Sequence, residues 1–160
     1  MTGITFTPIG TVHSPFRDPR DMPVQTIGAR GVRGTVELEP AYAAGLKDLA
    51  GFSRIILLYH FHRSEGYALE VVPFLDTTHH GVFATRAPRR PNAIGLSILR
   101  LVAVEGATLT VEDIDILDGT PVLDIKPYVP AFDAYPDERS GWLTAAAEDP
   151  RTMRSDDRFC

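Results

Sequence analysis

Hydrophobic and polar positions alternate over short distances along most of the chain, and Gly, Pro or Asp residues separate the runs. Runs of this length are typical of β-strands. The pattern predicts strands over residues 3–12, 32–38, 54–62, 82–85, 94–104, 108–116 and 122–126. The stretch 13–23 is too rich in proline for anything but a loop.

Two of the predicted strands have features of their own. Residues 54–62 are almost continuously hydrophobic, which predicts a strand that is buried on both faces at the centre of the fold. In 108–116 the apolar positions change parity after Val111, and this change predicts a β-bulge at residue 112 or 113. A bulge there would re-aim the side chain of Asp115. Residues 105–107 form the hairpin connection before this strand.

Helical signals are few. Pro40 is suited to a first helical turn, and Gly51 stands in the place of a C-terminal stop, so the pattern predicts a helix over 41–50. A short helix around Trp142 and Leu143 is also expected. Many short strands at nearly regular spacing predict a mainly β fold, a closed or nearly closed barrel with one or two short helices.

Composition narrows the class of protein. With 160 residues and 44% hydrophobic content, the chain fits one domain, expected over 1–147, followed by a flexible tail over 148–160. No run approaches the roughly 20 residues that cross a bilayer, and the first residues lack a signal peptide, so a soluble, cytoplasmic protein is expected. The sole cysteine, Cys160, excludes an internal disulfide. The net charge of −5 argues against a protein that coats nucleic acid, but it permits a local contact.

The densest cationic cluster lies in 85–97, where Arg86, Arg89, Arg90 and Asn92 are framed by prolines and a glycine. Guanidinium groups on a stiff loop suit an anionic or planar ligand, because they present fixed donors and a flat face. A proline-stiffened surface loop with solvated arginines is the alternative.

A second polar group follows the predicted strand 108–116. Asp118 and Gly119 form a turn signal, and alternation then places Asp124 and Lys126 on one face of a strand, with Tyr128 close behind. A site is one interpretation of this group, and a surface ion pair between Asp124 and Lys126 is the other.

Histidines suggest a third possibility. His60 and His62 share one side of the predicted strand 54–62, and with Glu65 they resemble the ligand set of a cupin-like metal-dependent enzyme. The spacing does not match that ligand set cleanly. His79 and His80 are interpreted as polar loop residues.

Several blocks occur together in one order: Gly10-Thr-Val-His-Ser-Pro-Phe16, Pro23-Val-Gln25, Leu49-Ala-Gly-Phe-Ser53, Gly81-Val-Phe-Ala-Thr-Arg86, Arg90-Pro-Asn-Ala-Ile-Gly-Leu-Ser97 and Asp118-Gly-Thr-Pro-Val-Leu-Asp-Ile-Lys-Pro-Tyr128. With these blocks, residues 8–143 resemble the TsaA-like, or TrmO, family of tRNA methyltransferases, in a short form without the extra C-terminal domain. The resemblance implies a single-sheet β-barrel, a homodimer, and S-adenosylmethionine as the methyl donor. The chain has no Gly-x-Gly-x-x-Gly motif, which agrees with a fold other than the Rossmann fold.

The resemblance also implies where S-adenosylmethionine binds. Carried over to this sequence, the cofactor contacts of the family fall on Pro23, Val24, Gln25, His62, Arg63, Arg86, Leu96, Asp115, Ile116, Leu117 and Asp118. We expect Arg86 to meet the methionine carboxylate bidentately, and an Asp of 115–118 to meet the ribose hydroxyls or the amino group. No metal site is expected.

The acceptor implied by the resemblance is N6 of threonylcarbamoyladenosine beside the tRNA anticodon. Residues expected to position this acceptor are Arg89, Arg90, Asn92, Lys126 and Tyr128, on grounds of charge and loop position. Val24 stands where the family usually has Arg, and Ala93 replaces a more common Pro. Two other possibilities therefore stay open: a methyltransferase for a small acceptor, and a catalytically silent module that only binds S-adenosylmethionine.

Overall fold

The computed structural model describes residues 2–20, 22–145, 151–156 and 158. Six strands form one closed antiparallel barrel, in the order β1, β2, β7, β6, β3, β8. The strands are β1 (Gly10–His13), β2 (Arg33–Leu38), β3 (Arg54–His60), β6 (Ile94–Glu105), β7 (Thr108–Glu112) and β8 (Pro121–Pro127). This confirms the predicted mainly β, single-sheet barrel.

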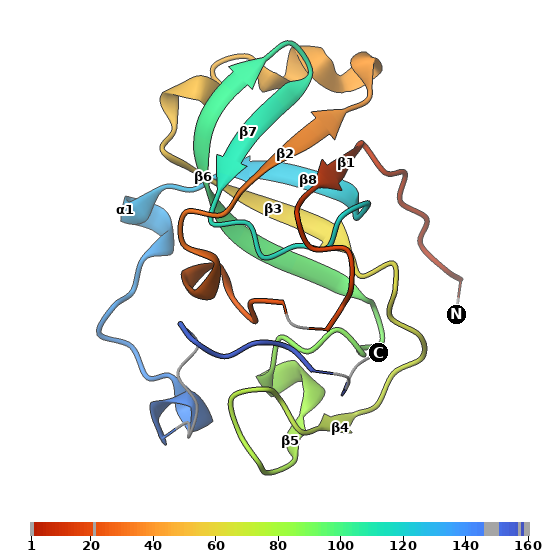
Figure 1. Ribbon diagram of the computed structural model, residues 1–160, viewed down its shortest axis with the longest axis vertical. Coiled ribbons are helices and arrows are strands. Elements are labelled where there is room, and N and C mark those ends of the chain that lie inside the picture. The colour runs from red at the N-terminus through yellow and green to blue at the C-terminus, as the bar shows by residue number, and fades with distance from the viewer. Residues whose placement is uncertain (1, 21, 146–150, 157, 159–160) are drawn as a thin grey trace.

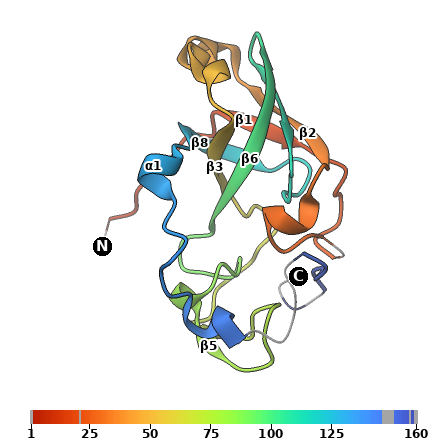
Figure 2. The ribbon, with the colours of Figure 1, turned by 90° about the vertical axis from the view of Figure 1, so that its left-hand side faces the viewer.

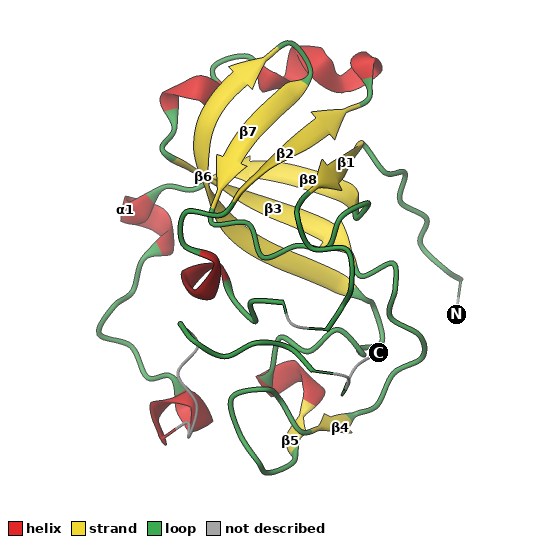
Figure 3. Cartoon of the chain, in the orientation of Figure 1, coloured by secondary structure: helices red, strands yellow, loops and turns green. Residues whose placement is uncertain are grey.

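The barrel occupies the upper part of the view in Figure 1, and a lobe of loops lies below it. In this lobe two short strands, β4 (Glu70–Val71) and β5 (His80–Gly81), form a separate ribbon. The helical segments are short: the 3-10 turns η1 (Thr26–Ala29), η2 (Pro40–Leu46), η3 (Leu49–Gly51), η4 (Val82–Ala84) and η5 (Gly141–Ala145), and the α-helix α1 (Pro130–Asp133). Figure 3 shows how little of the lobe is regular structure. No helix of the described residues is long and apolar enough to cross a membrane.

One side of the sheet faces the barrel interior, and alternate side chains fill that interior. The largest fully buried side chains are Ile55, Leu57, Leu99, Leu109, Ile114, Ile116, Val12, Val36, Val82, Val111 and Val122. All of these except Val82 belong to one hydrophobic cluster inside the barrel. Burial of this apolar surface is the main stabilising contribution to the fold.

The prediction that 54–62 is buried on both faces is wrong. Along β3 the residues alternate between buried and half-buried, and the strand ends at His60. Ile56 and Leu58 lie on the outer, half-covered face. A barrel made of one sheet has only one enclosed face, so a continuous hydrophobic run does not require two buried faces.

The predicted helix over 41–50 is also wrong as a single α-helix. The segment forms the 3-10 turns η2 and η3, which are separated where Asp48 takes a left-handed conformation with φ of 69°. A segment of ten residues gains little from helix propagation, and Gly45 weakens it further.

Several strand boundaries differ from the prediction. The strand expected over 3–12 begins only at Gly10, and residues 82–84 of the strand expected over 82–85 form η4. The strands over 32–38, 94–104 and 122–126 are confirmed within one residue at each end. The turn at Gly106 is confirmed, with φ of 60° at that glycine. The short helix around Trp142 is confirmed as η5.

The predicted bulge at 112 or 113 is a strand end. Strand β7 stops at Glu112, and Asp113 takes a left-handed conformation with φ of 67°. The Asp113 carboxylate accepts a hydrogen bond from the Gly31 N–H at 2.8 Å, which holds this turn. The change of parity itself is confirmed, because Ile114 and Ile116 are buried.

The predicted boundary between residues 147 and 148 lies outside the described residues, as does Cys160. The described part of the expected tail contacts the loop that precedes η1. Ser155 donates its backbone N–H to Met22 O at 2.6 Å and its hydroxyl to Pro19 O at 2.7 Å. In Figure 1 this blue C-terminal segment runs beside the orange loop.

Candidate functional site

A large cleft opens between one end of the barrel and the lobe of loops. It has a volume of about 1950 Å³, more than the roughly 300–1,000 Å³ of an ordinary ligand pocket. Its walls come from the loop 22–27, the end of β3, the loop after η4, the start of β6 and the turn after β7. Residues 137–144 and Ser155 add a C-terminal wall. Figure 2 shows the lobe below the barrel end from the side.

Most of the predicted cofactor residues meet in this cleft. The ones that line it are Pro23, Val24, Gln25, His62, Arg63, Arg86, Leu96, Asp115, Ile116 and Leu117. They come from five separate stretches of the chain, so the fold is what brings them together.

Arg86 is one of the arginines that line the cleft. Its Nη1 donates to Gln25 Oε1 at 3.0 Å, which links the loop after η4 to the loop before η1. Arg86 is exposed, so its guanidinium can still reach a ligand in the cleft.

The loop that carries Arg86 is held by hydrogen bonds within itself. Arg90 Nη1 donates to Thr85 O and to Ala87 O, each at 3.0 Å. Thr85 is buried, and its hydroxyl donates to Val82 O at 2.8 Å. The guanidinium of Arg90 therefore braces the loop, a role that the sequence alone did not indicate.

Asp115 is the carboxylate that lines the cleft at the end of the turn after β7. It follows the left-handed turn at Asp113, and its Oδ1 accepts a hydrogen bond from the Ser97 hydroxyl at 2.6 Å. Burial raises the pKa of Asp115 to about 6, although the Ser97 hydrogen bond and the positive charge of Arg86 act in the opposite direction. The turn thus re-aims Asp115 toward the cleft, as the predicted bulge would have done.

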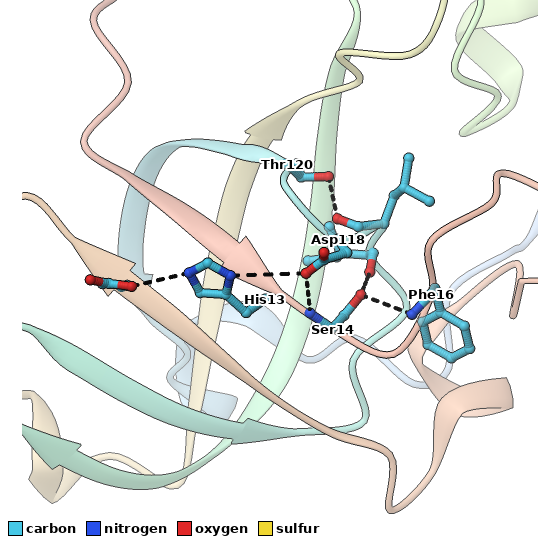
Figure 4. Close-up of polar contacts among 8 residues, drawn as sticks. His13, Ser14, Phe16, Asp118 and Thr120 are labelled. Atoms are coloured by element: carbon cyan, nitrogen blue, oxygen red, sulfur yellow. Dashed lines mark hydrogen bonds and ion pairs between the residues drawn. The ribbon is translucent and has the colours of Figure 1, made fainter.

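Asp118 does not line the cleft and has a structural partner. Figure 4 shows its carboxylate beside the end of β1, where Oδ1 accepts the Ser14 N–H at 3.0 Å and lies 3.9 Å from His13 Nδ1. The Ser14 hydroxyl donates to Ile116 O at 2.5 Å. These contacts tie β1 to the turn before β8, next to the cleft wall.

His62 lies just past the end of β3, on the cleft wall. Its pKa is lowered by burial and, to a smaller degree, by Arg63 and His60, so the neutral imidazole is favoured. The expectation that His60 and His62 share one strand face is wrong, because β3 ends at His60. Within the described ranges, no group of three or more His, Cys, Asp or Glu could hold a metal ion.

The residues predicted to position the acceptor do not all lie at the cleft. Arg90 lines the cleft, whereas Arg89 and Asn92 lie beside it on the same loop. Lys126 Nζ pairs with Asp124 Oδ2 at 2.7 Å on the exposed surface, which confirms the ion-pair interpretation. Lys126 and Tyr128 lie beside the start of β3, whereas the cleft lies at the end of β3.

Sequence reasoning missed the apolar side of the cleft. Ile27, Phe83, Ile94 and Leu143 line it together with Leu96, and all of these large side chains are substantially exposed. Phe83 is the most exposed of them, at 77%. The only signal was a pair of hydrophobic residues, Val82 and Phe83, which the prediction assigned to a strand.

The cleft therefore combines three kinds of surface. Arg86 can bind a carboxylate or phosphate, and Asp115 can accept hydrogen bonds from hydroxyl or ammonium groups. Exposed apolar side chains offer a face for a planar ring. A zwitterionic ligand that also carries a nucleoside has complementary groups for all three.

Comparison with known proteins gives matches along nearly the whole chain. Residues 11–134 match the family described as the tRNA-methyltransferase O N-terminal domain. A probable S-adenosyl-L-methionine-binding protein of Pyrococcus abyssi is 52% identical over 156 residues, which cover 98% of this chain and 85% of that protein. The tRNA (adenine(37)-N6)-methyltransferase of Escherichia coli is 33% identical, over 91% of this chain and 66% of that protein.

Solved structures of the same family also match this chain. The crystal structure of TrmO from Pseudomonas aeruginosa superposes with a TM-score of 0.74 at 42% identity, over 88% of this chain. The match covers 62% of the Pseudomonas aeruginosa chain, so the chain described here spans less than two thirds of that relative.

Proposed function

The chain belongs to the family of the tRNA-methyltransferase O N-terminal domain, and on that basis we propose that it is an S-adenosylmethionine-dependent methyltransferase that acts on tRNA. The observation that carries the proposal is the meeting of Arg86, Gln25 and Asp115 in one cleft with an apolar wall. Relatives named for binding S-adenosylmethionine or for methyl transfer support it.

The residues present fit the cofactor. Arg86, steadied by Gln25, would hold the methionine carboxylate, and Asp115 would accept from the ribose hydroxyls or the amino group. Exposed apolar side chains such as Leu96 offer a surface for the adenine. When bound, S-adenosylmethionine would supply an electrophilic methyl group: its sulfur–methyl bond would break as the methyl carbon bonds to the acceptor nitrogen, and the acceptor N–H proton would pass to solvent.

The acceptor that we propose is N6 of threonylcarbamoyladenosine beside the tRNA anticodon. The Escherichia coli relative, named for N6 methylation of adenine 37 in tRNA, supports this choice. The nitrogen is a weak nucleophile, so alignment with the methyl carbon and sulfur contributes most to catalysis. Arg89, Arg90 and Asn92, on the loop that borders the cleft, are the residues proposed to hold the anticodon loop. Because tRNA is a cytoplasmic substrate, we propose that the protein is located in the cytoplasm.

The decisive experiment is incubation with labelled S-adenosylmethionine and total tRNA, followed by mass spectrometry of the nucleosides. A methylated threonylcarbamoyladenosine is the expected product. Cofactor binding without transfer to any tRNA would redirect the search to small acceptors. Binding without transfer to any acceptor would indicate a silent binding module.

Contact with tRNA is tested separately from chemistry. Arg89→Ala should weaken tRNA binding and reduce the slope of log affinity against log salt by about 1, because one phosphate contact is lost. Lys126→Ala is the comparison, since that side chain is paired with Asp124 and lies away from the cleft. Unchanged affinity and slope for Arg89→Ala would remove Arg89 from the proposed interface.

We also propose that the protein works as a homodimer. Large exposed hydrophobic side chains outside the cleft, including Phe132 and Tyr135 at 70% and 69% exposure, offer surface for a second copy. Light scattering at micromolar concentration should give twice the chain mass. A mass of one chain would contradict this part of the proposal.

A further inference from the structure

Next to Asp115 lie two buried hydroxyl groups that the proposed cofactor contacts do not include, although Tyr59 also lines the cleft. Tyr59, on β3, is 6% exposed, and Ser97, on β6, is 2% exposed. The Tyr59 hydroxyl lies 2.9 Å from Ser97 Oγ, and Ser97 Oγ lies 2.6 Å from Asp115 Oδ1. Two barrel strands and the connection between β7 and β8 thus contribute to one line of hydrogen bonds at the cleft.

The line has a direction. A serine hydroxyl has a single hydrogen, and that of Ser97 is donated to the Asp115 carboxylate. Tyr59 must therefore donate to Ser97. Burial, and next the charge of Asp115, raise the pKa of Tyr59 well above its usual range, so its hydroxyl keeps its proton at every working pH. Both hydroxyls are polarised toward the carboxylate.

The sheet is shaped to admit the tyrosine ring. Tyr59 pairs with Gly95 across β3 and β6, and a Cβ added at Gly95 would lie 2.2 Å from Tyr59 Cε2. On its other side the ring meets Phe61 edge-on, with 5.5 Å between the centroids. Only a glycine leaves the space in which the Tyr59 hydroxyl reaches Ser97.

We propose that Tyr59 and Ser97 are positioning residues, a two-hydroxyl relay that orients the Asp115 carboxylate toward the ligand in the cleft. Among the described residues, Ser97 is the side chain that donates to this carboxylate. One oxygen is thus fixed by the protein, and the other can serve the ligand. The inference rests on the proposed function, because it takes the ligand of Asp115 to be S-adenosylmethionine.

A purely structural role for the two hydroxyls predicts a different result. As polar groups that only fill the barrel, they would affect stability and change ligand affinity equally at every pH. A relay acts through the ionisation of Asp115. The ionisable groups that act on Asp115 are Arg86, from the loop after η4, and Tyr59, from β3. The Arg86 guanidinium keeps its charge and Tyr59 keeps its proton between pH 5 and 8.5. His62, also on the cleft wall, changes its charge below its ordinary pKa, but it is the same in the wild type and the variants, so the difference between them reports Asp115.

The test is calorimetry with S-adenosylhomocysteine, which lacks the transferable methyl group, at pH 5.5, 6.5 and 8.5. In the wild type, affinity should rise with pH around the Asp115 pKa of about 6. Ser97→Ala removes a hydrogen bond that lowers this pKa, so the rise should move to higher pH. For a shift of one unit, the expected loss of affinity is about threefold at pH 6.5 and about eightfold at pH 5.5, and it nearly disappears at pH 8.5.

Tyr59→Phe keeps the ring and removes only the hydroxyl, so the variant should fold. The pH at which its affinity rises should also be higher than in the wild type, by a smaller amount than in Ser97→Ala. Ser53→Ala and Tyr42→Phe are the matched controls, because both residues are exposed and lie outside the cleft. A loss that is equal at all three pH values in Ser97→Ala and Tyr59→Phe, or no loss beyond the controls, would overturn the relay.

A ligand-free measurement separates this inference from the proposed function. A carbon-13 NMR titration of the aspartate carboxyls should give Asp115 a pKa of about 6 in the wild type and a higher pKa in Ser97→Ala. A wild type that binds no S-adenosyl ligand at any pH, yet shows this shift, would refute the proposed function and the ligand role of the relay but retain the Ser97–Asp115 coupling. Normal binding with no shift would refute the relay alone.

Discussion

At the scale of single residues, the buried carboxylate of Asp115 lowers the stability of the folded protein. The Asp115 carboxyl binds its proton more tightly in the folded state, where its pKa is about 6, than in the unfolded state, where its pKa is 3.8. The free energy of unfolding therefore falls as the pH rises from 3.8 to about 6. Asp115→Asn removes this charge. At pH 8 the variant should be more stable than the wild type by roughly 1–3 kcal/mol, with little difference at pH 4.

Urea unfolding at pH 4 and pH 8 measures that difference, and Asp124→Asn, at an exposed ion pair, is the control. Cofactor affinity of Asp115→Asn should fall even though the fold is more stable. A variant that is less stable than the wild type at both pH values would contradict the buried-charge argument.

Arg86 should carry much of the cofactor affinity. Arg86→Ala removes a charged, bidentate donor, so affinity should fall by roughly 1.5–3 kcal/mol, about 10- to 150-fold. Arg86→Lys keeps the charge without the fork and should recover part of the loss. Arg100→Ala, on the exposed part of β6, should have no effect. Unchanged calorimetric affinity of Arg86→Ala would exclude the carboxylate contact.

At the residue scale, the family blocks predicted the cleft better than any local pattern did. Arg86 and Asp115 were both expected, because Arg86 ends one of the family blocks and Asp115 lies just before another. Tyr59 and Ser97 were not expected, because a tyrosine and a serine on hydrophobic strands resemble ordinary core residues. Their relation depends on the register of β3 against β6, which the sequence does not display.

At the scale of elements, β1 decides whether the barrel closes. It pairs with β2 over four residues but with β8 only at Gly10 and Thr11. A Cβ at Gly10 would lie 2.4 Å from Glu37 O, a backbone atom of β2 that cannot move without disturbing the ladder.

Gly10→Ala should therefore destabilise the protein by about 1–3 kcal/mol in urea unfolding, with the loss arising at the β1 contacts. Gly45→Ala, where an added Cβ meets nothing within 4 Å, is the matched control and should be neutral or slightly stabilising. Equal stabilities for the two variants would show that β1 adjusts without cost.

Most strands were predictable as elements, whereas the helix expected over 41–50 was not. Alternation extends over whole strands and depends on one enclosed face, so β2, β6 and β8 were found nearly within their limits. The segment 41–50 has a helix-like composition, but its conformation is set by the left-handed Asp48. Such a turn depends on tertiary packing that no local signal reports.

At the scale of the whole molecule, the C-terminal segment helps to form the cleft. The Ser155 hydroxyl accepts the Met22 N–H at 2.7 Å, directly before the Pro23–Gln25 element, and Arg158 Nη1 donates to Pro73 O at 2.8 Å. The segment thus connects the two sides of the lobe.

Ser155→Ala should loosen the loop before η1. Hydrogen exchange at the Met22 amide should accelerate, and affinity for S-adenosylhomocysteine should fall several-fold, while the unfolding free energy changes by about 1 kcal/mol or less. Ser53→Ala serves as the control. Unchanged exchange at Met22 would show that the segment does not support the loop.

The closed order of the six strands has a consequence for association between chains. A sheet that returns on itself presents few unpaired N–H and C=O groups to a neighbour, so among the described residues it offers little template for amyloid-like strand addition. Such a template would appear first where β1 parts from β8, the seam with the fewest paired residues. Conditions that loosen that seam should therefore promote aggregation before the rest of the barrel unfolds.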